Sequence, residues 1–325
     1  MNYTVVIPTM GRTSLNVVLQ ALREADGPVP REIVVVDDRP VRYPQFVLGD
    51  DVRVLRTGGQ GPAAARNAGW RATTTEWIAF LDDDVVPSPE WKRRLVKDLT
   101  NLSEDVAASQ ARIDVPLSQD RDPTDWERGT AGLMVAKWIT ADMAYRRAAL
   151  QAVGGFDERF PRAYREDADL ALRIQEAGYQ IVSGERVTKH PVRPSGFFAS
   201  VKAQRGNMDD ALMRHVHGRD WRAKVGAYPT RLRRHALTTV ALMSALLGRR
   251  KGAAAVWAAL TAYFAYERIV PGPRSASEIT RMVVTSIVIP PAACAYRVRG
   301  ELRVRMDASG HDRKSVGGLD GPASR

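Results

Sequence analysis

Cysteine is almost missing from this sequence, with Cys294 the only one among 325 residues. A single thiol cannot form an intramolecular disulfide, so nothing in the chain requires an oxidising compartment. The first residues lead directly into an apolar, β-prone segment with no basic region before it, and we therefore expect no signal peptide. Both features predict a cytoplasmic protein.

Acidic residues are fewer than basic residues, and most of the basic excess lies in one part of the chain. The chain has 48 Lys and Arg against 37 Asp and Glu, for a net charge of +11. Residues 231–307 hold 13 basic and 4 acidic residues, which leaves residues 1–230 with a net charge of only +1. A basic protein can bind nucleic acid or an anionic membrane. Because the first 230 residues are nearly neutral, the charge argues against a nucleic-acid-binding protein and assigns a separate role to the C-terminal segment.

Long hydrophobic runs are also lacking. Three uncharged stretches follow one another near the C-terminus, at residues 236–248, 252–266 and 282–296. Each is shorter than the ~20 residues that a membrane-spanning helix needs, and Pro290-Pro291 interrupts the third. Their dense basic flanks predict short helices at the cytoplasmic face of an anionic membrane. The alternative is a helical subdomain packed on the rest of the protein, with a solvated basic rim.

The first part of the chain alternates apolar strands with helical segments. We expect strands at residues 3–8, 31–36, 52–56 and 77–81. The second of these ends at Asp37 and Asp38, and the fourth at Asp82, Asp83 and Asp84. The alternation predicts a mostly parallel sheet with helices on its faces, and ligands bind at the carboxyl edge of such sheets.

The run of three aspartates indicates a cation site. Adjacent carboxylates repel one another unless a cation or a ligand's donors hold them, and Mg²⁺ or Mn²⁺ binds one or two carboxylates together with phosphate oxygens. The alternative is an acidic loop that caps the helix expected at 90–102. A glycine-rich turn at 58–62 precedes a helix that carries Arg66. This turn can approach a phosphate, or it is an ordinary loop.

The second half of the expected catalytic region is less regular. We expect a strand at 106–115, an irregular loop over a cleft at 116–132, and strands at 139–145 and 179–182. Glu166 and Asp167 open a helix in between, where acids also complement the helix dipole without any catalytic role. His190 stands alone before Pro191, and such a histidine is commonly structural.

Together these segments resemble glycosyltransferase family 2, the inverting, nucleotide-sugar-dependent transferases with the GT-A fold. The matching motifs occur in family order and cover roughly residues 3–195: Val6-Ile7-Pro8-Thr9, Ile33-Val34-Val35-Val36-Asp37-Asp38, Ala65-Arg66-Asn67-Ala68-Gly69, Phe80-Leu81-Asp82-Asp83-Asp84, Gly154-Gly155-Phe156-Asp157-Glu158 and Glu166-Asp167-Ala168-Asp169-Leu170.

The resemblance implies a role for each candidate residue. The nucleotide-sugar-binding residues would be Pro8, Thr9, Asp37, Asp38, Arg66, Asn67, Asp82 and Asp83, with Asp37 and Asp38 at the base and Arg66 and Asn67 at the diphosphate. Mn²⁺ or Mg²⁺ would be held by Asp84, with Asp82 and His190 completing the shell. Asp167 would be the general base, with Glu166 the less favoured candidate.

These roles fit a single in-line displacement. One carboxylate deprotonates the acceptor hydroxyl as it attacks the anomeric carbon from the face opposite the diphosphate. The cation and Arg66 then stabilise the charge of the leaving group. A sugar nucleotidylyltransferase would share the nucleotide-binding half, but the first strand is not followed by a Gly-rich loop with Arg and Lys.

The sequence thus predicts three regions. Residues 1–230 form a GT-A catalytic domain, with a nucleotide-sugar half to about 115 and an acceptor half from about 116. Residues 231–307 form a basic, apolar helical extension that associates with the membrane, and residues 308–325 form a disordered tail. The expected acceptor is a glycan or lipid-linked molecule of the cell envelope, reached by an enzyme peripheral to the inner face of the cell membrane.

Overall fold

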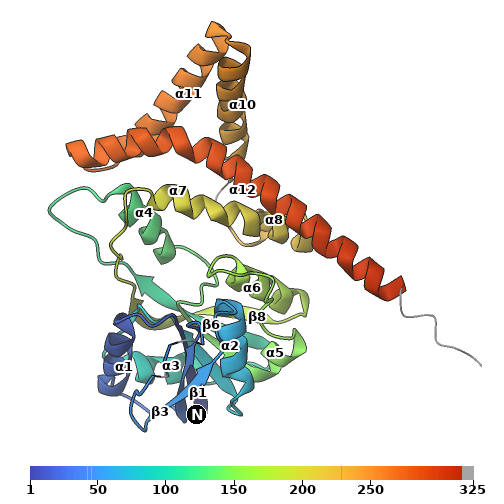
Figure 1. Cartoon of the computed structure of the whole chain (residues 1–325). Coiled ribbons are helices and arrows are strands. Elements are labelled where there is room, and N and C mark those ends of the chain that lie inside the picture. Colours follow the sequence, from blue (N-terminus) through green and yellow to red (C-terminus); the bar gives the residue numbers. More distant parts are fainter. Residues whose placement is uncertain (42, 45, 228, 317–325) are drawn as a thin grey trace, which may run out of the picture. The chain divides into compact units, whose positions relative to one another are not determined.

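The computed structural model describes residues 1–41, 43–44, 46–227 and 229–316 (Figure 1). Its strands are β1 (Tyr3–Thr9), β2 (Glu32–Asp37), β3 (Val52–Arg56), β4 (Trp77–Leu81), β5 (Val86–Pro87), β6 (Val106–Asp114), β7 (Asp142–Arg146) and β8 (Gln180–Lys189). Its α-helices are α1 (Ser14–Glu24), α2 (Pro62–Arg71), α3 (Trp91–Leu99), α4 (Asp125–Ala131), α5 (Arg147–Ala152), α6 (Glu166–Glu176), α7 (Ala199–Lys202), α8 (Gly206–His217), α9 (Trp221–Lys224), α10 (Leu232–Gly248), α11 (Lys251–Ile269) and α12 (Ala276–Val316). Two 3₁₀ turns are η1 (Gly132–Met134) and η2 (Ala203–Arg205).

The described chain divides into two compact units. The first contains Met1–Pro123, Glu127–Pro194 and Ala223–Ala227, and the second contains Thr124–Trp126, Ser195–Arg222 and the described residues that follow Ala227. The main division therefore falls at Pro194, whereas the sequence analysis placed it at 230. The reason is that α7 and α8 pack along α12 inside the second unit.

The first unit is built on one eight-stranded sheet with the order β3-β2-β1-β4-β7-β6-β8-β5. The strands β3, β2, β1 and β4 are parallel to one another, as predicted. β7 runs antiparallel to both β4 and β6, so β6 and β8 point in the same direction as β4. The carboxyl ends of β1, β2, β4, β6 and β8 therefore reach the same edge, and the predicted fold class is confirmed.

Helices cover both faces of this sheet (Figure 1). One apolar cluster joins α1 and α3 to one face through side chains such as Leu15, Leu19, Trp91 and Leu95. The other joins α2, α5 and α6 to the opposite face through Trp70, Leu150, Leu170 and Ile174. Since both faces are covered, the central strands are apolar throughout and every residue of β4 is buried.

Gly69 allows α2 to approach the sheet closely. A Cβ atom at this position would lie 2.3 Å from Cγ1 of Val6 on β1. Only glycine fits so near the strand, because any real side chain would push the helix outward. This contact sets the position of α2, and with it the position of Arg66 one turn earlier.

Two predictions for the first unit were wrong in detail. The stretch 116–132 is not a continuous loop, since α4 forms within it. The strand expected at 179–182 continues to Lys189 as β8. Its polar continuation reads as a loop, but Arg186 is fully buried and donates to Asp142 (2.8 Å), Asp98 (3.0 Å) and Ser109 (3.0 Å). Buried ion pairs thus replace the apolar side chains that a strand prediction relies on.

In the second unit, α12 packs against α8, α10 and α11. The helix continues through Pro290 and Pro291, where the sequence suggested an interruption. The prolines remove two helix hydrogen bonds, and packing along the neighbouring helices compensates. The third uncharged stretch is therefore part of a longer helix. The residues of the expected tail are helical from 308 to 316, and the remainder, 317–325, lies outside the described residues.

One segment of α12, Ala276–Asp307, is long and apolar enough to cross a membrane; its most apolar 18-residue window has a mean hydropathy of 1.4, and 33% of that window is buried. Length and composition alone place it in this group, and core helices of soluble proteins meet the same two criteria.

Candidate active site

A cavity of about 420 Å³ opens at the carboxyl edge of the sheet in the first unit. It is lined by Pro8, Thr9, Met10, Arg12, Asp38, Gly59, Gln60, Gly61, Pro62, Ala65, Arg66, Asp82, Asp83, Asp84, Pro161, Arg162, Ala163 and Arg193. Seven predicted residues are among them: Pro8, Thr9, Asp38, Arg66, Asp82, Asp83 and Asp84. Residues from four sequence regions therefore share one site at the edge that the sequence indicated.

Asp83 holds the ends of β1 and β4 together beneath this cavity. The hydroxyl of Thr9 donates to Asp83 Oδ2 at 2.5 Å, and the guanidinium of Arg12 pairs with Oδ1. Asp83 is only 1% exposed, so the two donors offset the cost of burying its charge. Of the three aspartates, Asp83 thus binds protein side chains, those of Thr9 and Arg12.

Asp38 organises the glycine-rich turn that forms a wall of the cavity. Its Oδ1 accepts from the hydroxyl of Thr57 (2.7 Å) and the amides of Gly59 (2.9 Å) and Gln60 (2.8 Å), and its Oδ2 accepts from the amide of Gly61 (2.9 Å). Four donors fill the acceptor capacity of a carboxylate. The turn is therefore fixed by Asp38 without any ligand.

Asp37 lies beside Asp38 in sequence but not in the cavity lining. Arg39 binds both of its oxygens at 2.8 Å, and Arg56 approaches Oδ2 at 3.8 Å. Burial acts against the charge of Asp37, but the hydrogen bonds from Arg39 hold its pKa below the usual value. The structure separates the two aspartates that the resemblance assigned to the nucleotide base.

Arg66 is the buried link between the cavity and α6. It is 1% exposed, and it donates to Asp82 Oδ1 and to Glu166 Oε1, both at 2.8 Å. Its guanidinium also lies 5.5 Å from the ring centre of Phe156. The two carboxylates keep the arginine charged despite its burial, and they aim it at the cavity.

Glu166 and Asp167 stand side by side at the N-terminus of α6 but have different surroundings. Glu166 is 2% exposed, and its Oε2 has no hydrogen-bond partner. Burial raises the pKa of Glu166 to about 8, with the charge of Asp167 adding and Arg66 opposing. Asp167 is half-buried and accepts from the amide of Ala168 at 2.7 Å. Burial raises the pKa of Asp167 as well, against that hydrogen bond and Arg66.

Asp82, Asp84 and His190 form a group with metal-ligand chemistry. One ligand atom from each lies within 4.8 Å of the others. Nε2 of His190 is 4.0 Å from Asp84 Oδ1, while Nδ1 faces the carbonyl oxygen of Pro191 at 3.3 Å. A carbonyl only accepts, so a hydrogen bond there places a hydrogen on Nδ1, and Nε2 of the neutral imidazole is then the nitrogen that could bind a cation. Such an arrangement orients a histidine ligand.

Asp84 itself is 5% exposed, and neither of its oxygens accepts a hydrogen bond of good geometry among the described residues. Burial raises its pKa, with the charge of Asp82 adding to the effect. Its carboxylate forms an ion pair with Arg193. A buried carboxylate that takes a cationic partner beside a second carboxylate and a histidine fits a divalent cation.

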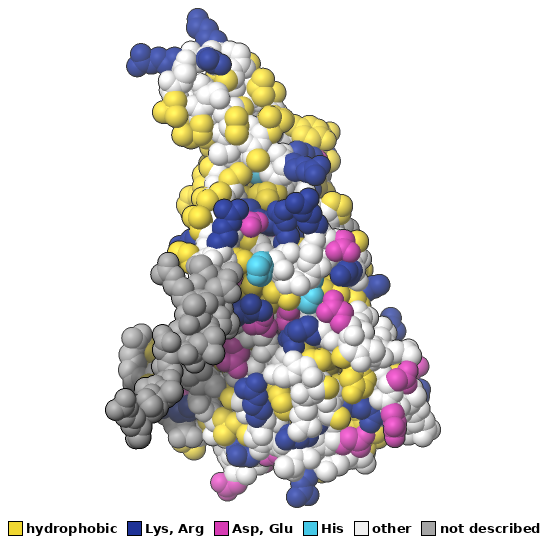
Figure 2. All heavy atoms as spheres, turned by 90° about the vertical axis from the view of Figure 1, so that its right-hand side faces the viewer, with side chains coloured by type: hydrophobic (Ala, Val, Ile, Leu, Met, Phe, Trp, Pro, Cys, Tyr) yellow, Lys and Arg dark blue, Asp and Glu magenta, His cyan; other side chains and the backbone are white. Residues whose placement is uncertain are grey.

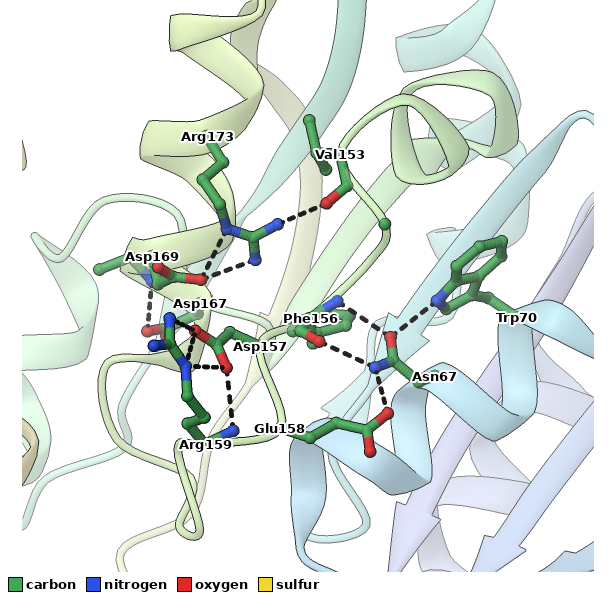
Figure 3. A network of polar contacts seen from close by, with 12 residues as sticks. Asn67, Trp70, Val153, Phe156, Asp157, Glu158, Arg159, Asp167, Asp169 and Arg173 are labelled. Carbon is green, nitrogen blue, oxygen red and sulfur yellow. Dashed lines mark hydrogen bonds and ion pairs between the residues drawn. The ribbon is translucent and has the colours of Figure 1, made fainter. Parts of the chain in front are cut away.

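Asn67, which was predicted to lie at the diphosphate, does not line the cavity. Its amide nitrogen donates to the Phe156 carbonyl (2.8 Å) and to Glu158 (2.7 Å), and its oxygen accepts from the amide of Phe156 and the indole of Trp70, both at 2.9 Å. Figure 3 shows the side chain between α2 and the turn at 154–158. All its hydrogen-bonding groups are used there, away from the cavity lining.

Sequence reasoning missed Arg12, Arg162 and Arg193, which line the cavity beside the aspartates. Arg193 is the most informative of the three because it pairs with Asp84. No spacing rule links it to the aspartates. Its position after β8 and near His190 was the only signal in the sequence.

A second cavity, of about 830 Å³, lies along β6 and β8 in the same unit. Its lining includes Gln110, Arg112, Lys137 and Trp138, and none of the predicted site residues. Gln110 accepts from the amide of Trp138 and donates to the Ala136 carbonyl at 2.9 Å, which holds Trp138 at a left-handed φ of 63°. Trp138 and Ile181 of this lining also pack against the apolar cluster that contains α6.

Comparisons with known proteins agree with this geometry. Residues 4–160 match the family model described as glycosyl transferase family 2. This part of the chain belongs to glycosyltransferase family 2. The match begins at the second residue of β1, continues through β7, and includes the aspartate run and the turn that Asn67 holds.

Similar proteins carry glycosyltransferase names. A pre-mycofactocin glycosyltransferase of Mycobacterium tuberculosis is 33% identical over 198 residues, which are 55% of this chain and 40% of that protein. An uncharacterized glycosyltransferase of Nostoc sp. is 30% identical over 147 residues, 39% of this chain and 45% of that protein. The chain thus spans less than half the length of each of these relatives.

Among solved structures, a mannosyltransferase from Pyrobaculum calidifontis in complex with GDP-Man and Mn²⁺ covers 91% of this chain and 87% of its own, with a TM-score of 0.57 and 20% identity. This likeness establishes the shared fold. The sheet whose edge carries the family 2 motifs and the cavity of this chain therefore has a fold that is also found in that mannosyltransferase.

Proposed function

We propose that this family 2 protein transfers a glycosyl group from a nucleoside-diphosphate sugar to an acceptor hydroxyl, with inversion at the anomeric carbon. The observation that carries the proposal is the cavity in which Asp82, Asp84 and Arg66 meet at the carboxyl edge of the sheet. It joins a cation site to a buried arginine, and a diphosphate needs both.

The donor would occupy the cavity between Thr9, Asp38 and Arg66. The turn 59–61, held by Asp38, supplies a wall that a flat base and a ribose can approach, and Pro8 and Thr9 line the cavity where β1 ends. Arg66 and the neighbouring Arg12 carry positive charge at this edge. We assign the diphosphate to Arg66, and we assign Asn67 to the support of the turn beside it.

Asp84, Asp82 and His190 would hold a divalent cation, Mn²⁺ or Mg²⁺. The fit rests on the buried, poorly hydrogen-bonded Asp84 carboxylate and on the His190 tautomer set by Pro191. When bound, such an ion offsets the charge of a departing diphosphate. Arg193 already pairs with Asp84, so it would have to rotate away or share the carboxylate with the ion.

Asp167 is our candidate for the general base. It is the more exposed of the two acids at the start of α6, and its raised pKa makes it a better proton acceptor than an ordinary aspartate. Glu166 is the more buried acid, and its Oε1 accepts from the guanidinium of Arg66 at 2.8 Å. We therefore propose that Asp167 takes the proton and that Glu166 positions Arg66.

The acceptor and the site of action are proposed on different grounds. The basic, apolar helices after residue 231 support work at the inner face of the cell membrane, on a glycan or lipid-linked acceptor of the cell envelope. The name of the mycobacterial relative ties that protein to pre-mycofactocin, so a peptide-derived acceptor is a second class to include in any screen.

The test is a panel of UDP-, GDP-, TDP- and ADP-sugars with and without Mn²⁺. A cognate donor raises the melting temperature only with the metal, since binding stabilises the native state by mass action. Release of nucleoside diphosphate then identifies transfer, and pyrophosphate exchange, in which added pyrophosphate converts the nucleotide sugar to a nucleoside triphosphate and a sugar 1-phosphate, would identify a nucleotidylyltransferase. If no nucleotide sugar in the panel shifts the melting temperature or is consumed, the proposed function is wrong.

A further inference from the structure

The hairpin formed by α10 and α11 is apolar on its outward side. On α10 the exposed large side chains are Leu237, Val240, Met243, Leu246 and Leu247, and on α11 they are Val256, Tyr263 and Tyr266. Spacings of three, four and seven residues place each set along one face of its helix. The opposite faces contain the buried residues, Thr238 and Ala241 on α10 and Thr261 and Phe264 on α11.

The far half of the hairpin has no core of its own. From residue 242 to residue 260, all of which the structure describes, no residue is buried. Figure 2 shows hydrophobic side chains over this part of the molecule, with Lys and Arg at its end. Helices of this length are marginal in water without tertiary packing, and an apolar surface of this extent on a soluble protein marks an interaction site.

The charges of the hairpin identify what covers it. Residues 236–266 contain three basic residues, Arg249, Arg250 and Lys251, all at the tip, and no acidic residue. Arg231, Arg233 and Arg234 stand at the other end of α10. An apolar surface with cations at both ends matches the acyl chains and phosphates of an anionic lipid layer, whereas a protein partner would be expected to meet mixed charge.

The length of the hairpin distinguishes lying in the membrane from crossing it. The uncharged parts of α10 and α11, 236–248 and 252–266, extend about 20 Å and 22 Å at ~1.5 Å per residue. The hydrocarbon core is ~30 Å thick. Crossing would also move the three tip cations to the far side, whereas a hairpin along the surface keeps both basic ends in one headgroup layer.

We propose that the α10–α11 hairpin embeds in one leaflet of an anionic bilayer, with its outward face among the acyl chains and its two basic ends at the phosphates. The inference rests on the proposed membrane association and makes the hairpin, not α12, the embedded element. The base of the hairpin is held by the ion pair of Arg234 with Glu267 and by Arg268, which donates to Asp125 at 2.8 Å and to Thr285 at 2.8 Å. These polar contacts hold the base of the hairpin to the rest of the second unit and leave its apolar outward face exposed.

The test is flotation of the full chain with vesicles of phosphatidylcholine and phosphatidylglycerol, and with phosphatidylcholine alone. The hairpin variant is Val240→Asp/Val256→Asp. Its matched controls are Val29→Asp/Val47→Asp, at exposed valines of the first unit, and Val283→Asp/Val298→Asp, at exposed valines of α12. Every altered side chain is exposed, so the helices keep their packing, and circular dichroism confirms it.

We expect the wild type and both controls to float with the anionic vesicles, and the hairpin variant to bind at least about a hundredfold more weakly, since it loses apolar burial and gains repulsion. Binding should persist in part at about 1 M NaCl, where the Debye length is ~3 Å. Complete release by salt would mean surface attachment without embedding and would overturn this inference alone. Equal loss in the α12 variant, or no loss in the hairpin variant, would also overturn it. If the wild type does not float with any vesicles, the membrane proposal is wrong as well. If the protein then forms dimers in a concentration-dependent way, the apolar face of the hairpin would instead bind a second copy of the chain.

Discussion

Replacing Asn67 by alanine separates a structural role for this residue from a role at the diphosphate. The substitution removes the partners of the Phe156 amide, the Phe156 carbonyl and the Trp70 indole, which bond to Asn67 at 2.8 to 2.9 Å. Each buried group left unpaired costs about 1–3 kcal/mol. Three such groups give about 3–9 kcal/mol, a large part of the ~5–15 kcal/mol that stabilises a typical domain.

The assay is urea unfolding of the variant and the wild type, followed by fluorescence and circular dichroism. Both probes are needed because the chain has two compact units, and only coincident transitions give one free energy of unfolding. Asn67→Asp is the matched control. It keeps an acceptor for the Phe156 amide and the Trp70 indole but places an oxygen against the carboxylate of Glu158, so we expect an intermediate loss that shrinks as the pH falls and the carboxyls take up protons.

Affinity for the cognate nucleotide, measured below the unfolding range, completes the experiment. We expect the affinity of the alanine variant for the nucleotide to change by less than about threefold, because Asn67 contacts the turn and does not line the cavity. A stability loss below about 1 kcal/mol together with a tenfold loss of affinity would refute it and return Asn67 to the diphosphate.

Three further predictions address the turn and the proposed chemistry. Gly155→Ala should destabilise the protein by about 2 kcal/mol more than Gly154→Ala in the same urea assay, since both glycines have positive φ but only a Cβ at Gly155 meets Asn67, at 2.5 Å. Asp84→Asn should weaken Mn²⁺ binding at least tenfold by titration calorimetry, and unchanged affinity would remove Asp84 from the cation site. Asp167→Asn should lower glycosyl transfer by about 10²–10⁴ with nucleotide affinity retained. Because burial raises the pKa of Asp167, wild-type activity should fall as the pH drops through that raised pKa. Glu166, whose pKa is about 8, is already protonated at that pH, so Glu166→Gln should leave the fall in place, and a shifted profile would contradict this order of titration.

Apolar strands and the acids at their ends were predictable because they follow simple rules. The strands β1, β2 and β4 are buried almost throughout, and a carboxylate directly after such a strand lies at the sheet edge. The meeting of Asp82 with Arg66 could be anticipated from that topology. The internal use of Asp83 and Asp38 could not, since it depends on donors from Thr9, Arg12 and the turn at 59–61.

Elements that are stabilised by buried polar contacts escaped prediction. The second half of β8 depends on Arg186, whose partners lie on α3, β6 and β7. The passage of α12 through Pro290 and Pro291 depends on the helices packed beside it. A local sequence pattern predicts neither the second half of β8 nor the continuation of α12, because each depends on contacts with residues that are distant in the chain.

The four hydrogen bonds that Asp38 makes to the turn at 57–61 also bear on kinetics. A wall that is already rigid loses little conformational entropy when a nucleotide arrives, so capture needs no slow ordering step and the on-rate stays close to that of simple encounter. In the proposed reaction, the spent nucleotide would leave only by breaking its contacts with Arg66 and with the cation held by Asp82, Asp84 and His190. Product departure, more than donor entry, would then limit the rate of turnover.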